Sequence, residues 1–251
     1  MKIAIVTGAS SGMGREFVCQ ISKRFKTIDE IWVIARRFDK LEELAETITN
    51  VKVRPLKYDI SDDADMIRFK MLLMQEKPQV RALVNSAGYG IIGKFEEISE
   101  DNVGMCKINC LGLTKMIDFV LPYMDCNRGN IWNIASSAAF MPQPSFATYA
   151  ATKSYVLSLS RALNKELKGK NITVTAVCPG PVKTEFFDVA EKHHSAKFYK
   201  KLGMAKPEKV VELALKDGFH GKSVSVYGTT MKAFRVLSKI LPHELMIKFV
   251  D

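Results

Sequence analysis

A tyrosine and a lysine four residues apart form the most reactive pair in this sequence of 251 residues. Tyr149 and Lys153 stand in Tyr-Ala-Ala-Thr-Lys, and of the seven tyrosines only Tyr149 has a lysine four positions on. Residues at this spacing share one face of a helix, so the two side chains can act together in proton transfer. Because such a pair arises easily by chance in a lysine-rich chain, it has weight only together with other residues.

Two further polar residues extend the pair. Ser136 follows the apolar segment 131–135 and precedes Tyr149 by 13 residues. Ligands of open α/β sheets bind at the carboxyl ends of strands, which is where Ser136 is predicted to lie. Asn109 stands among apolar neighbours in a predicted helix, where an amide needs a partner. Asn109 is therefore either part of a catalytic site or a packing amide whose hydrogen bonds are satisfied.

A glycine-rich segment, 7–14, follows the first predicted strand. Glycine permits a tight turn and close approach of the backbone to a pyrophosphate, and a helix N-terminus attracts phosphate. The three glycines also fit an ordinary strand-to-helix turn, but their place at the first such junction favours a dinucleotide site. The predicted contacts are Gly8, Ser10, Ser11, Gly12, Met13 and Gly14.

Arg36 and Arg37 follow the second predicted strand, at Ala35-Arg36-Arg37. An NAD site usually has an acid there to bind the ribose 2′-hydroxyl, and this sequence has none. Guanidinium groups instead suit the 2′-phosphate of NADP(H) by bidentate pairing. The alternative is that the two arginines merely begin a solvated helix. We therefore expect NADP(H), with NAD(H) the less favoured cofactor.

These residues need a scaffold, and the hydrophobic pattern predicts one. Apolar β-branched runs alternate with helical patterns, which predicts one doubly wound parallel sheet, Rossmann-like, with helices on both faces. The predicted strands are 2–7, 30–35, 51–57, 80–85, 130–135, 171–177 and 222–226. The predicted helices lie near 13–25, 39–49, 62–76, 101–124, 149–168 and 207–217. We expect a single domain over 1–251, with an irregular segment at about 181–206 acting as an active-site lid.

At these residues the sequence resembles the short-chain dehydrogenase/reductase family, in its ordinary-length branch that includes hydroxysteroid and lipophilic carbonyl dehydrogenases. The resemblance reaches to about residue 228 and combines the glycine loop, Asn109, Ser136, Tyr149 and Lys153 with three more motifs. These motifs are Asp59-Ile60, Asn85-Ser86-Ala87-Gly88 and Pro179-Gly180-Pro181-Val182-Lys183-Thr184. The one departure is Ser86, where the family usually repeats asparagine.

The resemblance implies a role for each matching residue. Tyr149 would act as the acid/base, with the Lys153 ammonium lowering the pKa of its hydroxyl from about 10. Ser136 would hydrogen-bond the substrate oxygen, and Asn109 would anchor a water that relays protons to Lys153. The cofactor contacts that the resemblance implies are Asp59, Ile60, Asn85, Ala87, Gly88, Tyr149, Lys153, Pro179, Gly180, Val182 and Thr184.

The substrate is less closely defined by the sequence. The residues expected to line its pocket suggest a lipophilic alcohol or carbonyl compound such as a steroid; they are Tyr89, Ile91, Met141, Phe146, Phe186, Phe187 and Phe198 or Tyr199. A 3-oxoacyl-thioester reductase is the main alternative, because lysines in the lid could receive an acidic carrier protein. A non-catalytic NADP(H)-binding protein is a third, but such relatives usually lose the Tyr149 or Lys153 equivalent.

The composition limits the classes of molecule that this protein is expected to bind. Thirty-seven basic and 27 acidic residues give a net charge of +10, but the lysines are scattered and there is no nucleic-acid motif, so we expect no nucleic-acid partner. No apolar run approaches the ~18 residues of a membrane span. The five cysteines form no Cys-x-x-Cys pair, which suits a reducing, cytoplasmic location. No clustered Cys/His spacing exists, so we expect no metal.

The tail, 229–250, has apolar residues at helical spacing with basic residues between them. The pattern predicts two short amphipathic helices broken at Pro242. Helices this short do not persist alone in water, so they must pack on a surface. We expect that surface to be protein, in this subunit or a neighbouring one, and we expect no membrane contact. Many relatives are dimers or tetramers, so a homodimer or homotetramer is expected here.

Overall fold

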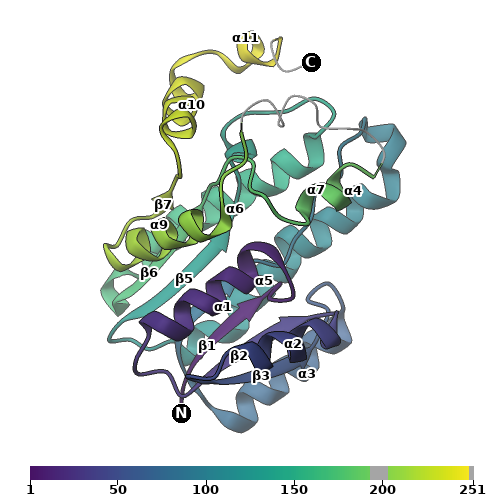
Figure 1. Ribbon diagram of the computed structural model, residues 1–251. Helices are drawn as coiled ribbons and strands as arrows, with labels where there is room; N and C mark the ends of the chain where they lie inside the picture. The colour runs from purple at the N-terminus through teal and green to yellow at the C-terminus, as the bar shows by residue number, and fades with distance from the viewer. Residues whose placement is uncertain (193–202, 249–251) are drawn as a thin grey trace.

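The computed structural model describes residues 1–192 and 203–248 of the chain (Figure 1). Its centre is a seven-stranded sheet in the order β3-β2-β1-β4-β5-β6-β7, with every neighbouring pair parallel. The strands are β1 (Lys2–Thr7), β2 (Glu30–Ala35), β3 (Lys52–Lys57), β4 (Gln79–Asn85), β5 (Gly129–Ile134), β6 (Ile172–Val177) and β7 (Val224–Ser225). The predicted doubly wound parallel sheet is confirmed.

Helices cover both faces of this sheet (Figure 1). The helices are α1 (Gly12–Arg24), α2 (Phe38–Thr47), α3 (Asp63–Glu76), α4 (Ser99–Cys106), α5 (Leu113–Val120), α6 (Ala147–Glu166), α7 (Phe186–Ala190), α9 (Pro207–Phe219), α10 (Thr229–Ile240) and α11 (His243–Ile247). One core forms where α1, α2 and α9 pack on the sheet, and it includes Phe17, Leu41 and Val211. A second core forms under α3, α5 and α6 on the opposite face. Burial on both faces explains why the strands are continuously apolar.

The strand order reverses at β1, which lies between β2 and β4. The connections after β1 and after β4 therefore leave the sheet in opposite directions. A crevice opens at such a switch point, outside the carboxyl ends of the strands. The glycine loop after β1 and the Asn85–Gly88 segment after β4 meet there.

The single helix predicted over 101–124 is wrong. The chain forms α4, then a π-helical segment η2 (Lys107–Gly112), then α5, and it ends in a 3₁₀ turn at Leu121–Tyr123. The wider π turn contains Asn109, whose side chain is bonded to the backbone of Tyr89. Such segments are common at functional sites because they re-aim one side chain within a helix. Hydrophobic periodicity does not encode this change.

Two predictions in the C-terminal third also need correction. The strand predicted over 222–226 is only two residues long, because β7 pairs with just Ala176 and Val177 at the edge of the sheet. The segment 181–206 is not irregular throughout. Its ends are joined by a bridge between Val182 and Ala205, and it contains α7. The rest of the predicted lid, 193–202, lies outside the described residues.

The tail forms α10 and α11, which Pro242 separates (Figure 1). On its inner side, the Phe234 ring lies 6.1 Å from that of Phe140. On its outer side, Val236, Leu237 and Ile240 are exposed. None of the helices within 1–192 and 203–248 is long and apolar enough to cross a membrane.

Candidate active site

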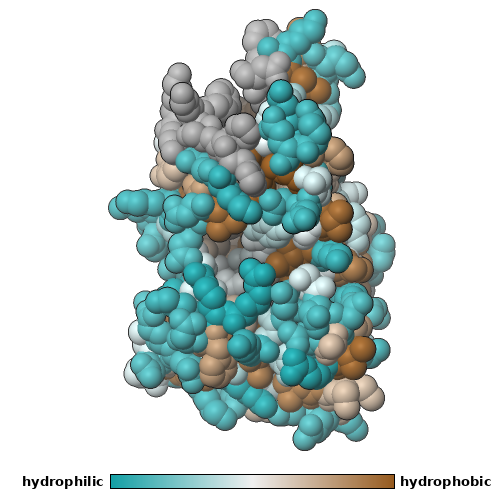
Figure 2. Space-filling model, turned by 90° about the vertical axis from the view of Figure 1, so that its right-hand side faces the viewer, coloured by the Kyte–Doolittle hydropathy of each residue, from teal (hydrophilic) through white to brown (hydrophobic). Residues whose placement is uncertain are grey.

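A pocket of about 590 Å³ opens at the carboxyl ends of the parallel strands. It runs from the glycine loop to the start of α7, and Figure 2 shows the molecule hollowed at mid-height on the face that it displays. The volume is within the range of small-molecule and cofactor sites. Predicted site residues that line it are Gly8, Ser10, Ser11, Gly12, Met13, Arg36, Arg37, Asp59, Ile60, Ala87, Gly88, Ser136, Tyr149, Lys153, Pro179, Gly180, Val182 and Thr184.

The glycine loop forms one end of the pocket out of backbone. Gly8 has a φ of +66°, and a Cβ there would lie 2.6 Å from the backbone nitrogen of Ala87. Gly12 has a φ of +53°, and a Cβ there would lie 3.3 Å from the Thr184 side chain. The first turn of α1 contains no acidic residue, and Ser11 makes no side-chain cap. An open helix N-terminus beside a glycine cradle fits a dinucleotide pyrophosphate.

Gly14 and Asn85, two of the predicted cofactor contacts, do not line the pocket. A Cβ on Gly14 would lie 2.2 Å from the carbonyl oxygen of Gly8, so this glycine lets α1 pack against the loop. Asn85 is buried, and its Nδ2 donates to Asn133 Oδ1 at 2.8 Å. Both residues support the walls of the pocket from behind.

The two arginines line the pocket, and each is paired with a carboxylate. Arg37 Nη2 lies 2.9 Å from Glu185 Oε2 and 3.2 Å from Ser10 Oγ. Arg36 Nη1 lies 3.7 Å from Asp59 Oδ2. Both side chains are substantially exposed, so these cations border the cleft at its open edge. A 2′-phosphate placed there would meet two guanidinium groups.

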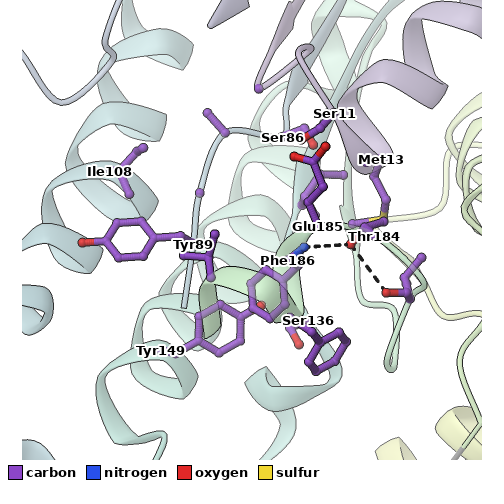
Figure 3. Close-up of a pocket in the computed structure, with 18 of the residues that line it drawn as sticks. Ser11, Met13, Ser86, Tyr89, Ile108, Ser136, Tyr149, Thr184, Glu185 and Phe186 are labelled. Carbon is purple, nitrogen blue, oxygen red and sulfur yellow. Dashed lines mark hydrogen bonds between the residues drawn. The ribbon is translucent and has the colours of Figure 1, made fainter. Parts of the chain in front are cut away.

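Tyr149 lies at the end of the pocket opposite the glycine loop, where aromatic side chains surround its ring. Its ring stacks on that of Phe146 at 4.3 Å and lies 5.5 Å from that of Phe186. A Cβ on Gly90 would approach Tyr149 Cδ2 to 2.5 Å, so the ring rests directly on the backbone of that residue. Figure 3 shows Tyr149 and Ser136 together at the pocket, with Phe186 beside them. These contacts restrict the ring to one orientation.

Lys153 is buried beneath this end of the pocket. Its ammonium donates to the carbonyl oxygen of Ile134 at 2.8 Å and lies 5.6 Å from the centre of the Tyr149 ring. Burial lowers the pKa of Lys153 to about 8, because desolvation disfavours the charged form. The side chain is therefore still mostly protonated at neutral pH but gives up its proton readily above it.

Asn109 lies close to this group without lining the pocket. Its Oδ1 accepts from the Tyr89 backbone N–H at 3.1 Å, and its Nδ2 donates to the Tyr89 carbonyl at 2.9 Å and to Thr152 Oγ1 at 3.0 Å. It thus ties η2 to α6 and to the segment after β4. Ser136 Oγ accepts from the Ala138 backbone N–H at 3.1 Å, which leaves its proton free to point into the pocket.

Apolar side chains line the pocket around Tyr149. Of the predicted substrate contacts, Tyr89, Ile91, Phe146, Phe186 and Phe187 line it. Met141 is buried and does not, so that prediction is wrong, because the chain has turned away from the pocket at the end of the 3₁₀ helix Ser137–Phe140. Phe198 and Tyr199 lie outside the described residues.

Some lining or supporting residues were not predicted from the sequence, and they include Gly90, Glu185, Val189, Tyr58, Asp101 and Ile108. The available signal for Glu185 was its position directly after Thr184, in the predicted nicotinamide segment. Gly90 follows Tyr89 in the motif after β4, where a second glycine two residues after Gly88 could have indicated another close approach.

Comparison with known proteins agrees with this geometry. The short chain dehydrogenase family profile matches residues 2–195. The chain is 33% identical over 223 residues to an NADP-dependent 3-hydroxy acid dehydrogenase of Schizosaccharomyces pombe, covering 85% of each protein. It is 34% identical over 191 residues to a very-long-chain 3-oxoacyl-CoA reductase of Rattus norvegicus, covering 72% of this chain and 60% of that protein.

Solved structures give the same result. A short-chain dehydrogenase of Sphingobium yanoikuyae, determined in complex with NADPH, superimposes with a TM-score of 0.81 at 26% identity. The match covers 96% of this chain and 97% of the other. The chain therefore belongs to the short-chain dehydrogenase/reductase family of oxidoreductases.

Proposed function

We propose that this protein transfers a hydride between NADP(H) and the carbonyl or hydroxyl group of a lipophilic substrate, with Tyr149 as the acid/base. The observation that carries the proposal is the position of Tyr149. Its ring is fixed where a polar, glycine-lined cleft meets an aromatic wall. A proton donor placed there reaches a carbonyl oxygen while the rest of the substrate contacts apolar side chains.

The cofactor preference rests on Arg36 and Arg37. Both border the cleft beyond the glycine loop, at the end of β2 where an NAD site would hold an acid. The name of the fission yeast relative and the ligand of the Sphingobium structure support the same choice. When bound, the cofactor supplies or accepts the hydride at its nicotinamide ring.

The chain's own residues supply the proton and the electrostatics. Ser136 and Tyr149 donate hydrogen bonds to the reacting oxygen, and so stabilise the negative charge that develops on it. Tyr149 gives up its proton during reduction and takes one during oxidation. Lys153, with a pKa of about 8, is suited to return that proton near neutral pH. Asn109 is a positioning residue, since it holds the segments of Tyr89 and Thr152 around this group.

The substrate class rests on the wall opposite the cofactor cleft. Phe146, Phe186, Phe187, Ile91 and Val189 line it. Burying apolar substrate surface against these side chains provides affinity of roughly 25 cal/mol per Å².

A 3-oxoacyl-thioester reductase is the second candidate. The rat relative carries a 3-oxoacyl-CoA name, and Lys192 lines the pocket mouth, where it pairs with Asp101 at 3.9 Å. A cation there suits the phosphates of a thioester carrier. This observation favours the thioester over other polar substrates.

Turnover measurements separate the two. We expect faster oxidation of NADPH than of NADH, and activity on a panel of bulky ketones including steroids. A clear preference for 3-oxoacyl thioesters over those ketones would select the second candidate. Activity on neither panel, with intact NADPH binding, would favour a binding protein.

We also propose that the protein is a homodimer or homotetramer. Apolar side chains are exposed on η2 and α6, which carry Asn109 and Tyr149, and on the adjoining α4: Val103, Leu111 and Tyr155. Light scattering coupled to size-exclusion chromatography gives the mass directly. A monomeric mass at micromolar concentration would contradict the proposal.

A further inference from the structure

One ion pair joins two parts of the pocket that are 148 residues apart in the sequence. Arg37 comes from the end of β2, and Glu185 from the segment after β6. The guanidinium Nη2 lies 2.9 Å from the Glu185 carboxylate, and both residues line the pocket. Figure 3 shows the Glu185 side chain pointing across the pocket toward Ser11. An acidic group therefore reaches into the region where the cofactor phosphates are expected.

We propose that Glu185 is a cofactor-selectivity residue that competes with the 2′-phosphate for Arg37. This inference rests on the proposed use of NADP(H). A guanidinium pairs bidentately with an anion through two N–H groups on one edge, and Arg37 Nη2 already shares its two hydrogens between Glu185 and Ser10. A 2′-phosphate that pairs bidentately with the Nη1–Nη2 edge of Arg37 must therefore displace the Glu185 carboxylate.

The neighbouring arginine does not present the same competition. Arg36 is 3.7 Å from Asp59, too far for a strong hydrogen bond. The other oxygen of Asp59 accepts from the backbone N–H and the hydroxyl of Ser61, which holds that carboxylate against its own loop. Arg36 is therefore free to turn toward a phosphate, while Arg37 has to exchange one anion for another.

The negative charge of Glu185 determines which of the two cofactors is disfavoured. Glu185 carries a negative charge beside a site for a 2′-phosphate dianion, so it disfavours NADPH through repulsion as well as through occupancy of Arg37. NADH has no 2′-phosphate, so it does not compete with Glu185 for Arg37. Glu185 therefore reduces the preference for NADPH that the two arginines create. Because both partners are half exposed, the effect is modest.

The test uses the Glu185→Gln variant and ligands that differ only in the 2′-phosphate. Dissociation constants are measured by calorimetry for adenosine 2′,5′-bisphosphate and for 5′-AMP, and by nicotinamide fluorescence for NADPH and NADH. We expect E185Q to bind the two 2′-phosphorylated ligands about fivefold more tightly, the upper end for an exposed ion pair. Binding of 5′-AMP and NADH should change less than about twofold.

Two controls make the result specific. Glu43→Gln removes the same charge from an exposed ion pair with Arg15 outside the pocket, and it should change none of the four constants. In an Arg37→Gln background, E185Q should lose most of its effect, because the shared guanidinium is gone.

Three outcomes would overturn the proposal: unchanged or weaker binding of the 2′-phosphorylated ligands by E185Q, equal tightening of all four ligands, or a full effect in the Arg37→Gln background. A parent protein that binds neither NADPH nor NADH would instead refute the proposed function. Thermal melts of each variant identify any that is misfolded, in which case Glu185→Ala replaces E185Q.

Discussion

At the glycine-loop end of the pocket the walls are backbone, whereas at the Tyr149 end they are aromatic side chains. A Cβ on Gly8 or Gly14 would strike main-chain atoms, which cannot rotate out of the way. Around Tyr149 the neighbours include the rings of Phe146 and Phe186. The cofactor end therefore tolerates little substitution, while the substrate end can be reshaped by exchanging side chains on an unchanged backbone.

The largest expected effect separates chemistry from binding. Tyr149→Phe removes the proton donor but keeps the ring and its stacking, so turnover should fall by about 10²–10⁴-fold while NADPH affinity is retained. Tyr155→Phe is the matched control on the same helix, since its hydroxyl contacts Thr114 outside the pocket. Steady-state kinetics and cofactor titration of both variants make the comparison. Near-normal turnover of Y149F would rule out Tyr149 as the acid/base.

The second prediction concerns Lys153, which is buried beneath the Tyr149 end of the pocket. Its pKa is about 8 in the folded protein against an ordinary 10.5, so between these values the unfolded chain binds more protons. Stability must then rise with pH across this window, by about 3 kcal/mol in total, and the buried charge costs most below pH 8.

Lys153→Met should remove that rise and be more stable than the parent protein at pH 7. Urea unfolding at pH 7, 8, 9 and 10 measures both proteins under the same conditions. Parallel pH profiles of parent and variant would contradict the assignment of a depressed pKa to Lys153.

The third prediction concerns the glycine-loop end of the pocket, whose walls are backbone. Gly8→Ala places a methyl group 2.6 Å from the Ala87 nitrogen at a φ of +66°. The glycine loop must shift to make room for the methyl group. We expect NADPH affinity to fall by about tenfold or more, because the left-handed backbone is strained by a side chain and the shifted loop no longer fits the cofactor phosphates. Gly169→Ala is the control, because a Cβ there meets nothing within 4 Å. Fluorescence titration of NADPH tests the pair, and equal affinities would show that the loop is more deformable than its contacts indicate.

The smallest expected effect lies at the aromatic end. Gly90→Ala would push against the Tyr149 ring, with its new methyl group 2.5 Å from Cδ2. We expect turnover to fall by about tenfold through misplacement of the hydroxyl, with NADPH affinity within about twofold of the parent. A loss of cofactor affinity as large as that of G8A would mean that the two ends are not independent.

Much of the fold could be read from local patterns. The strand predicted over 2–7 matches β1, and the helix predicted over 149–168 matches α6 within two residues at each end. Apolar runs and helical periodicity are properties of neighbouring residues, so they survive without tertiary information. The interrupted helix 99–123 was not predicted: the hydrogen bonds of Asn109 in η2 are made with Tyr89, 20 residues away, and a local pattern does not record such contacts.

The candidate site divides in the same way. Motif spacing indicated Ser136, Tyr149 and Lys153, which the structure brings to one end of one pocket. It did not indicate that Asn85 turns into the sheet toward Asn133, or that Gly90 supports the Tyr149 ring. These are contacts between side chains and distant backbone, which no local pattern records.

The sequence by itself indicated the parallel sheet, the glycine cradle and the grouping of Ser136, Tyr149 and Lys153, because apolar runs and short motifs are properties of neighbouring residues. Only the tertiary structure decided which partners the charged groups take. Arg37 meets Glu185 because the segment after β6 reaches back past the three strands that separate β2 from β6 in the sheet. Lys153 has a pKa of about 8 because helix α6 buries it beneath the pocket. Burial and long-range pairing arise only when distant segments pack, and they set the electrostatics of this site.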